Sequence, residues 1–298
     1  MLIRKVISFR CVQKSFTSQS RWLNAIRNEL IGSEEKISIQ TDKEINGVYV
    51  MTMSHPEKKN AMSYEMINPM RESIRKLHIN SDVRALVLRS ALPGVFCAGA
   101  DLKERLAMSN EQVENFVDGL RSLTNELHML PFPTIAAING FALGGGLEIA
   151  LACDLRVASS RAKMGLVETK WALLPGAGGS QRLSRIIGLG KAKDMIYGAR
   201  IVDSEEALRI GLIEYAVEQE DNEDAATKRA LIVARDIASR GPLAMRAAKF
   251  AIDKGIETDL QTGLAIEKAS YGRIIPTKDR IEGLKAFSEK RTPAYKGE

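Results

Sequence analysis

Residues 141–154 read FALGGGLEIALACD, so three consecutive glycines precede a single glutamate in an apolar run. Glycine weakens a helix, and an ionised carboxylate is costly to bury. A helix beginning at Gly144 or Gly145 explains the combination, because its first N–H groups lack intrahelical partners and lie at the positive end of the dipole. Glycine leaves them open to an oxygen that becomes negative during a reaction. Glu148 falls on the first turn, which places a titratable carboxylate beside these donors.

A second donor for the same oxygen is expected from VFCAGADLKE at residues 95–104. This stretch follows the short β-rich run at 84–89 and contains a turn of small residues. We expect the Ala98 N–H in this turn to face Gly145 across a shared cleft.

A second carboxylate is expected from MGLVETKWALLPGAGG at residues 164–179, where Glu168 lies near the end of a predicted strand. Water addition to a polarised double bond requires one group that activates water and another that protonates carbon, and Glu148 and Glu168 suit these tasks. Each feature alone also fits a structural role: close packing for the triple glycine, an ion pair for Glu148, and a helix cap for Glu168.

Strands, glycine turns and helices alternate in the first two thirds of the chain, which indicates an α/β domain with largely buried strands. The predicted strands are residues 37–41, 47–54, 84–89, 134–138, 155–158 and 162–166, and the predicted helices are 63–79, 109–129 and 144–152. Pro69 predicts a kink or a late start in the first helix, and Ser109 with Gln112 predicts a capping box. Beyond about residue 178 the pattern is helical, which is typical of a cap or an oligomerisation module.

Charge is distributed unevenly along the 298 residues. The net charge is +6, but residues 1–28 hold six basic residues and no acid, and the remainder balances 37 basic against 37 acidic residues. A basic, serine-rich start without acids is typical of a mitochondrial transit peptide, with a disordered basic tail as the alternative. Charge therefore gives little reason to expect nucleic-acid binding.

Cysteine and histidine patterns give no sign of a metal site or a disulfide framework. The three cysteines, Cys11, Cys97 and Cys153, form no CxxC pair, and the three histidines have no ligand spacing. Cys97 and Cys153 stand in apolar surroundings, where small packing residues are usual. We therefore expect no metal ion.

Taken together, these motifs resemble the crotonase superfamily, the enoyl-CoA hydratase/isomerase family, over roughly residues 37–298. The resemblance rests on FCAGADLKE, PTIAAINGFALGGGLEIALACDLRVA, MGLVETKWALLPGAGGSQRL and IPTKDRIEGLKAFSEKR. It implies a spiral of repeated ββα units with a helical C-terminal trimerisation region, and a trimer or a dimer of trimers. The division expected is a leader at 1–34, a spiral core at 35–230 and a helical oligomerisation region at 231–298.

The resemblance also implies roles for individual residues in hydrating an acyl-CoA thioester. Ala98 and Gly145 match the oxyanion donors, Glu148 the base, and Glu168 the group that protonates carbon. Positions matching the CoA-binding segments are Lys58, Ala61, Gly99, Ala100 and Asp101, with Lys290 from a neighbouring subunit. Coenzyme A is part of the substrate, so no separate cofactor is expected.

GLVET and the ending YKGE are most similar to a mitochondrial branch of the family that includes a hydratase of methylglutaconyl-CoA, an intermediate of leucine degradation. General short-chain enoyl-CoA hydration in β-oxidation is the alternative. A distal substrate carboxylate would call for a basic residue at the acyl pocket, and Arg105 and Lys170 are candidates. The branch also includes an RNA-associated member, but the balanced charge beyond residue 28 makes RNA binding less expected. The implied location is the mitochondrial matrix, with no membrane partner.

Overall fold

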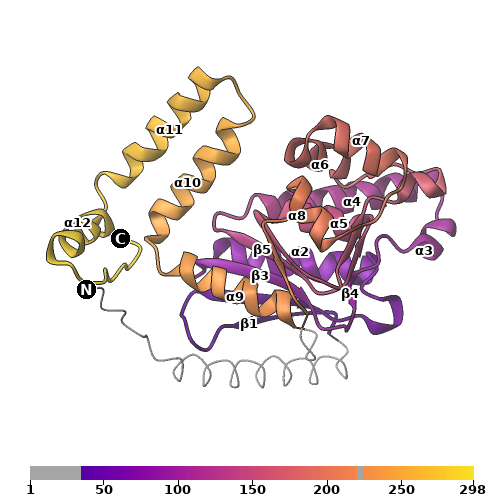
Figure 1. Ribbon diagram of the computed structural model, residues 1–298, viewed down its shortest axis with the longest axis horizontal. Helices are drawn as coiled ribbons and strands as arrows, with labels where there is room; N and C mark the ends of the chain where they lie inside the picture. Colours follow the sequence, from indigo (N-terminus) through magenta and orange to yellow (C-terminus); the bar gives the residue numbers. More distant parts are fainter. Residues whose placement is uncertain (1–34, 220–223) are drawn as a thin grey trace, which may run out of the picture.

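The computed structural model describes residues 35–219 and 224–298. The predicted leader at 1–34 lies outside these residues. The described chain forms a layered α/β body and an arm of helices at its C-terminal end (Figure 1).

Two sheets organise the α/β body. The larger sheet has the order β1 (Ile37–Thr41), β2 (Val48–Met53), β3 (Ala85–Ser90), β5 (Thr134–Ile138), β7 (Leu155–Ser159) and β10 (Tyr215–Val217). The smaller has the order β4 (Val95–Cys97), β6 (Phe141–Leu143), β8 (Lys163–Gly165) and β9 (Val202–Asp203). Only the pairs β1–β2 and β8–β9 are antiparallel within these sheets.

The chain winds repeatedly through both sheets. The strand pairs β3–β4, β5–β6 and β7–β8 each place their first strand in the larger sheet and their second in the smaller. Helices follow each pair: α3 (Leu102–Leu106) and α4 (Asn110–His128), then α5 (Gly145–Ala152), then the 3₁₀ turn η2 (Glu168–Trp171) and α6 (Gly179–Ile187). This repetition confirms the expected spiral of ββα units. Because β4, β6 and β8 are parallel neighbours, the segments after them lie at one edge of the sheet.

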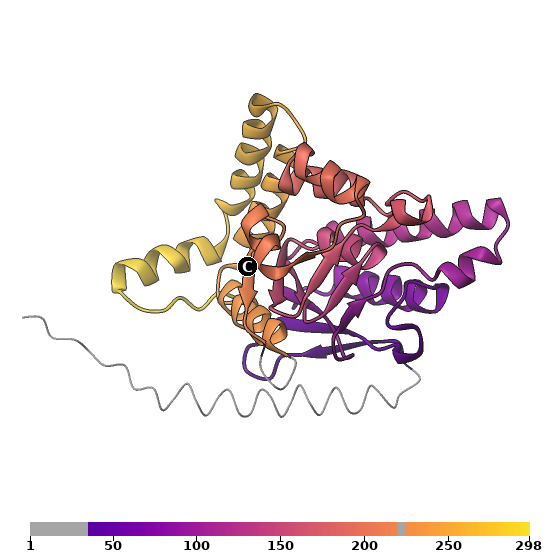
Figure 2. The ribbon, with the colours of Figure 1, turned by 45° about the vertical axis from the view of Figure 1, so that its right-hand side comes forward.

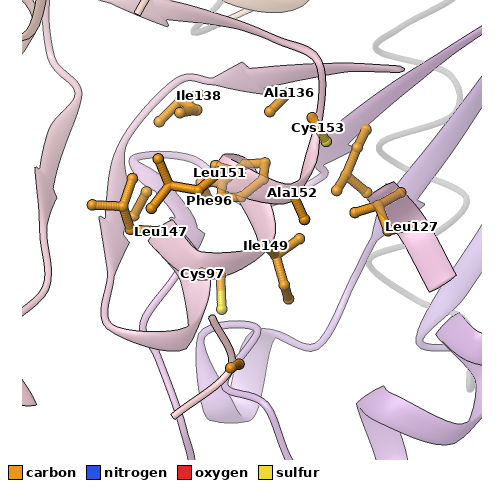
Figure 3. Packing of buried hydrophobic residues seen from close by; sticks show 14 of the residues in the cluster. Phe96, Cys97, Leu127, Ala136, Ile138, Leu147, Ile149, Leu151, Ala152 and Cys153 are labelled. Carbon is orange, nitrogen blue, oxygen red and sulfur yellow. The ribbon is translucent and has the colours of Figure 1, made fainter. Parts of the chain in front are cut away.

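Apolar side chains from these windings fill the space between the sheets and the helices. Phe96, Leu147 and Ile149 are fully buried, and the close view shows them packed with Cys97 and Leu151 (Figure 3). The other face of the larger sheet is covered by α9 (Ala225–Ala238), which forms a second cluster with residues such as Val50 and Val157. Both faces of the sheet are thus covered, which accounts for its continuous apolar strands.

The starts of α4 and α2 test two predictions made from local sequence signals. Ser109 and Gln112 form the predicted capping box at the start of α4. Of the two alternatives predicted from Pro69, the late start was wrong, because α2 (Tyr64–Ile79) begins at Tyr64 and includes Pro69, and the kink stays a prediction. Its buried face, which includes Met66, Met70 and Ile74, holds the helix against the core although Pro69 cannot donate a backbone hydrogen bond.

The expected domain boundary between residues 230 and 231 falls inside α9. The helix contacts β3, β5 and β7 along its length and therefore belongs to the body. The arm begins at Gly241 and comprises α10 (Pro242–Gly255), α11 (Leu260–Ile274) and α12 (Lys278–Glu289). It projects from the body in both views (Figures 1 and 2). α7 (Leu189–Tyr197) and α8 (Ser204–Ile210) complete the body.

Candidate active site

The start of α5 presents backbone donors as the triple glycine predicts. Gly144 is the N-cap residue with φ of 50°, and its N–H donates to the Gly165 carbonyl at 2.8 Å. Gly145 is the first helical residue, and within residues 35–219 and 224–298 its N–H donates to no carbonyl oxygen. This open donor lies at the positive end of the helix dipole.

The second donor is not the residue that the sequence predicted. The Ala98 N–H donates to the Lys59 carbonyl at 3.1 Å, so it is not available to a ligand. The Ala100 N–H has no carbonyl partner in the described part of the chain, and a Cβ added to Gly145 would lie 3.6 Å from the Ala100 nitrogen. Ala100 therefore replaces Ala98 as the donor that faces Gly145.

Glu148 lies one turn into α5 and is almost completely buried. Its Oε1 accepts hydrogen bonds from the N–H groups of Ala177 and Gly179, each at 2.8 Å. Burial raises the pKa of this carboxyl, and the two N–H groups oppose the shift by stabilising the ionised form. The start of α6 thus fixes the orientation of Glu148.

Glu168 begins η2 and approaches the start of α5 from the neighbouring winding. A Cβ added to Gly144 would lie 3.3 Å from Glu168 Oε1, so the carboxyl lies beside the glycine turn. Its Oε2 is buried, and in the described part of the chain it has no hydrogen-bond partner. Burial, and then the charge on Glu148, raise the pKa of Glu168 to about 7.

The two carboxyl groups therefore differ in their surroundings. Glu148 receives two N–H groups, whereas the only backbone group that lowers the pKa of Glu168 belongs to Glu168 itself. Two acids that share a site cannot both ionise readily. The two N–H groups on Glu148 Oε1 favour Glu148 as the ionised member of the pair and leave Glu168 as the group to hold the proton, which is the division that acid–base chemistry needs.

Most of the predicted CoA-binding residues lie close to Gly145. Gly99, Ala100 and Asp101 lie in the turn beside Gly145, and the buried Ala61 lies in the segment paired with that turn. These positions are compatible with a thioester chain that ends at the two donors.

Lys58 is close to the same turn but is already surrounded by acids. Its Nζ lies 3.1 Å from Asp101, 3.7 Å from Glu65 and 3.9 Å from Glu104. Asp101 also caps α3 by accepting the N–H groups of Lys103 and Glu104. The Lys58 charge is thus balanced within the protein.

Lys290 is separated from this site. It follows α12 as its C-cap residue with φ of 55°, and α12 lies on the opposite side of the molecule from α3 (Figures 1 and 2). A contribution of Lys290 from a neighbouring subunit stays a prediction.

Sequence reasoning named Ala100 only as a CoA-binding position and not as an N–H donor, and it did not identify Ala177 and Gly179, so the last two were missed. The stretch PGAGG at 175–179 carried a signal for the last two, because glycine allows close approach. A Cβ on Gly179 would lie 2.8 Å from Glu148 Oε1, so glycine is needed here for the carboxylate to reach the N–H group.

Other reactive groups do not compete with this assignment. Burial raises the pKa of the Cys97 and Cys153 thiols to about 12, which is unfavourable for a nucleophile. The described residues contain no group of three or more His, Cys, Asp or Glu side chains arranged to hold a metal ion. Among them there is also no helix long and apolar enough to cross a membrane.

Comparison with known proteins agrees with the fold. Human mitochondrial methylglutaconyl-CoA hydratase is 51% identical over 267 residues, covering 89% of this chain and 79% of its own length. Mouse mitochondrial enoyl-CoA hydratase domain-containing protein 2 is 49% identical over 251 residues, covering 84% of this chain and 85% of its own length. The crystal structure of an enoyl-CoA hydratase from Bacillus anthracis superposes with a TM-score of 0.84 at 44% identity, covering 89% of this chain and all of that one. The sequence profile of the family described as enoyl-CoA hydratase/isomerase matches residues 43–298, and the chain belongs to this family.

Proposed function

We propose that this protein adds water across the 2,3 double bond of a short enoyl-CoA, with the thioester oxygen bound by the N–H groups of Gly145 and Ala100. Ionised Glu148 takes a proton from water as the water oxygen bonds to C3. The π electrons move toward the thioester oxygen, and protonated Glu168 delivers its proton to C2. Return of the proton from Glu148 to Glu168 restores the starting state. Loss of one oxyanion donor costs about 3 kcal/mol in comparable sites.

The observation that carries this proposal is the convergence of two unequal carboxyls and two open N–H groups at one sheet edge. Glu148→Gln and Glu168→Gln test it, because each removes one proton-transfer group while keeping the side-chain shape. Each is expected to abolish hydration of crotonyl-CoA, with the oligomer unchanged by light scattering. Wild-type turnover in either variant would remove that residue from the mechanism.

We further propose methylglutaconyl-CoA as the preferred substrate, consistent with the names of human and mouse relatives that are 51% identical. Its distal carboxylate needs a cation near the acyl group. Arg105, on α3, suits this role because its positive charge reaches Glu168 and lowers its pKa. Lys170 suits it less, since its side chain is exposed and its Nζ lies over the ring of Trp171, 5.5 Å from the centroid.

Relative specificity distinguishes this substrate from the alternative. The kcat/KM for methylglutaconyl-CoA is expected to exceed that for crotonyl-CoA. Arg105→Met is expected to lower only the former, and Lys170→Met to change neither by much. A higher kcat/KM for crotonyl-CoA would place the protein among general short-chain hydratases of β-oxidation.

The remaining proposals concern location and assembly. The human and mouse relatives named above are mitochondrial, and we infer the same location for this chain, with residues 1–34 as the leader and the matrix as the compartment. We infer a trimer or a dimer of trimers built through the helical arm, in which Lys290 approaches the CoA bound by a neighbouring subunit. N-terminal sequencing of the protein recovered from mitochondria tests the leader, because an intact residue 1 would contradict it.

A further inference from the structure

Two successive residues beside the site adopt a backbone conformation that is uncommon outside glycine. Lys59 has φ of 51° and Asn60 has φ of 55°, both in the left-handed region. Asparagine tolerates this region better than most residues, but such conformations persist only where the surroundings impose them. The contacts of this pair therefore indicate what the conformation achieves.

The side chain of Asn60 is completely buried and uses both of its polar atoms. Its Oδ1 accepts the His55 N–H at 2.7 Å, and its Nδ2 donates to Ser90 Oγ at 2.8 Å and to the Phe96 carbonyl at 3.0 Å. Ser90 ends β3, and Phe96 is the central residue of β4. One amide thus connects the left-handed loop to the end of β3 and to the middle of β4.

The segment that follows this anchor pairs directly with the turn at 98–101. The Lys59 carbonyl accepts the Ala98 N–H at 3.1 Å, Met62 N–H donates to the Gly99 carbonyl at 2.7 Å, and Asp101 N–H donates to the Met62 carbonyl at 3.0 Å. Three main-chain hydrogen bonds therefore fix the turn against residues 59–62.

This pairing determines where the Ala100 N–H points. In extended chain, successive residues direct their N–H and carbonyl groups to opposite sides. Because the Gly99 carbonyl and the Asp101 N–H both face Met62, the N–H of Ala100 points to the other side, which is the side of Gly145. Gly99, with φ of 103°, reverses the chain so that Ala98 and Ala100 donate in different directions.

We propose that Asn60 is a positioning residue of the oxyanion hole, because its buried amide holds residues 59–62 in the place that aims the Ala100 N–H at the thioester oxygen. This inference rests on the proposed hydration reaction and on its two donors. Asn60 itself does not touch the substrate. Its loss is expected to misalign one of the two donors.

Asn60→Gly is the most direct test, because glycine keeps the left-handed backbone without strain and removes only the amide. The kcat for crotonyl-CoA is expected to fall roughly 10- to 100-fold, and KM is expected to change less than threefold. This fall in kcat should not exceed the one that follows removal of a whole oxyanion donor. The fraction of bound acetoacetyl-CoA present as its enolate, read from ultraviolet absorption, is expected to fall in parallel. A purely structural role would not change that fraction.

Two further variants keep the test decisive. Ser90→Ala removes one acceptor of the Asn60 amide and is expected to cause a smaller fall in kcat and in enolate absorption, even if Asn60→Gly does not fold. Ala199→Gly is the matched control, since Ala199 is also left-handed, with φ of 46°, but follows α7 outside the site. It should leave both readouts at their wild-type values.

Different results would overturn the positioning role of Asn60 and the hydration reaction on which it rests. Unchanged kcat and enolate absorption in folded Asn60→Gly, or in Ser90→Ala when the first variant does not fold, would overturn the positioning role. A wild-type protein that neither hydrates crotonyl-CoA nor binds acetoacetyl-CoA as its enolate would instead refute the proposed hydration reaction.

Discussion

The carboxyl groups of Glu148 and Glu168 approach the start of α5 from different windings of the spiral, and the charge on Glu148 raises the pKa of Glu168. Glu148 is oriented by two N–H groups from the start of α6, whereas Glu168 Oε2 has no partner in the described part of the chain. The two acids thus differ in solvation and in hydrogen bonding. Because of that difference, Glu148 is suited to accept a proton and Glu168 is suited to donate one.

The raised pKa of Glu168 predicts opposite pH dependences for the two reaction directions. Hydration needs the protonated acid, so kcat/KM for crotonyl-CoA is expected to fall as pH rises through about 7. Dehydration of 3-hydroxybutyryl-CoA needs the ionised form, so its kcat/KM is expected to rise through the same pH. Initial rates in both directions between pH 6 and 9 provide the measurement. Hydration that is constant over this range would contradict the assignment of Glu168 as the acid.

The same group predicts a pH-dependent effect on stability. The pKa of Glu168 rises from 4.5 to about 7 on folding, so the native state binds more protons than the unfolded state between these values. The contribution of Glu168 therefore lowers the free energy of unfolding as pH rises from about 4.5 to about 7. Above about pH 7 the free energy of unfolding stops changing through this group. Glu168→Gln cannot ionise, so its Tm is expected to exceed that of the wild type by more at pH 8 than at pH 5.

Thermal unfolding at the two pH values tests this prediction. Glu57→Gln is a suitable control, because Glu57 is an exposed carboxylate in the 3₁₀ turn η1 (Pro56–Lys58). It should shift Tm equally at both pH values. An equal shift for Glu168→Gln would mean that ionisation of Glu168 does not oppose folding.

Much of the site could be predicted because it depends on local signals. Three glycines before an apolar run indicate a helix start, and Glu148 on its first turn has a position fixed by helix geometry. Glu168 and the small-residue turn follow short β-rich runs, and parallel strands bring such ends to one edge. These relations need only the order of elements along the chain.

The errors arose where direction depends on a single dihedral angle or on distant packing. The choice of Ala98 over Ala100 was wrong because Gly99 adopts φ of 103° and reverses the side to which N–H groups point. The expected boundary at 230 falls inside α9, whose buried face packs against the larger sheet. The direction of the Ala100 N–H and the packing partner of α9 are not visible in composition or periodicity.

The second glycine of α5 illustrates how closely the site is packed. A Cβ on Gly146 would overlap the Cys97 carbonyl oxygen and lie 2.8 Å from the Cys97 Cβ. Gly146→Ala is therefore expected to destabilise the protein by about 1–3 kcal/mol or more, because neither backbone can move without disturbing the donors. Gly119, inside α4, has no atom within 4 Å of an added Cβ. Gly119→Ala is expected to stabilise by about 0.5–1 kcal/mol.

Urea unfolding of the two alanine variants measures both effects. Their opposite signs separate steric overlap from helix propensity, since both substitutions replace glycine by a better helix former. A gain in stability for Gly146→Ala would show that α5 and β4 are not in the close contact described.

The arm predicts self-association through apolar side chains that are exposed in the single chain. Ile256, Leu260 and Phe287 are 81%, 74% and 87% exposed, which is unusual for a group of large apolar residues on one projecting unit. Phe287→Asp is expected to shift the protein to smaller species in sedimentation velocity at micromolar concentration, because a buried unpaired carboxylate opposes association. Ile79→Asp is the control, since Ile79 is 84% exposed at the end of α2 and lies outside the arm. A wild-type distribution for Phe287→Asp would place the subunit contacts away from α12.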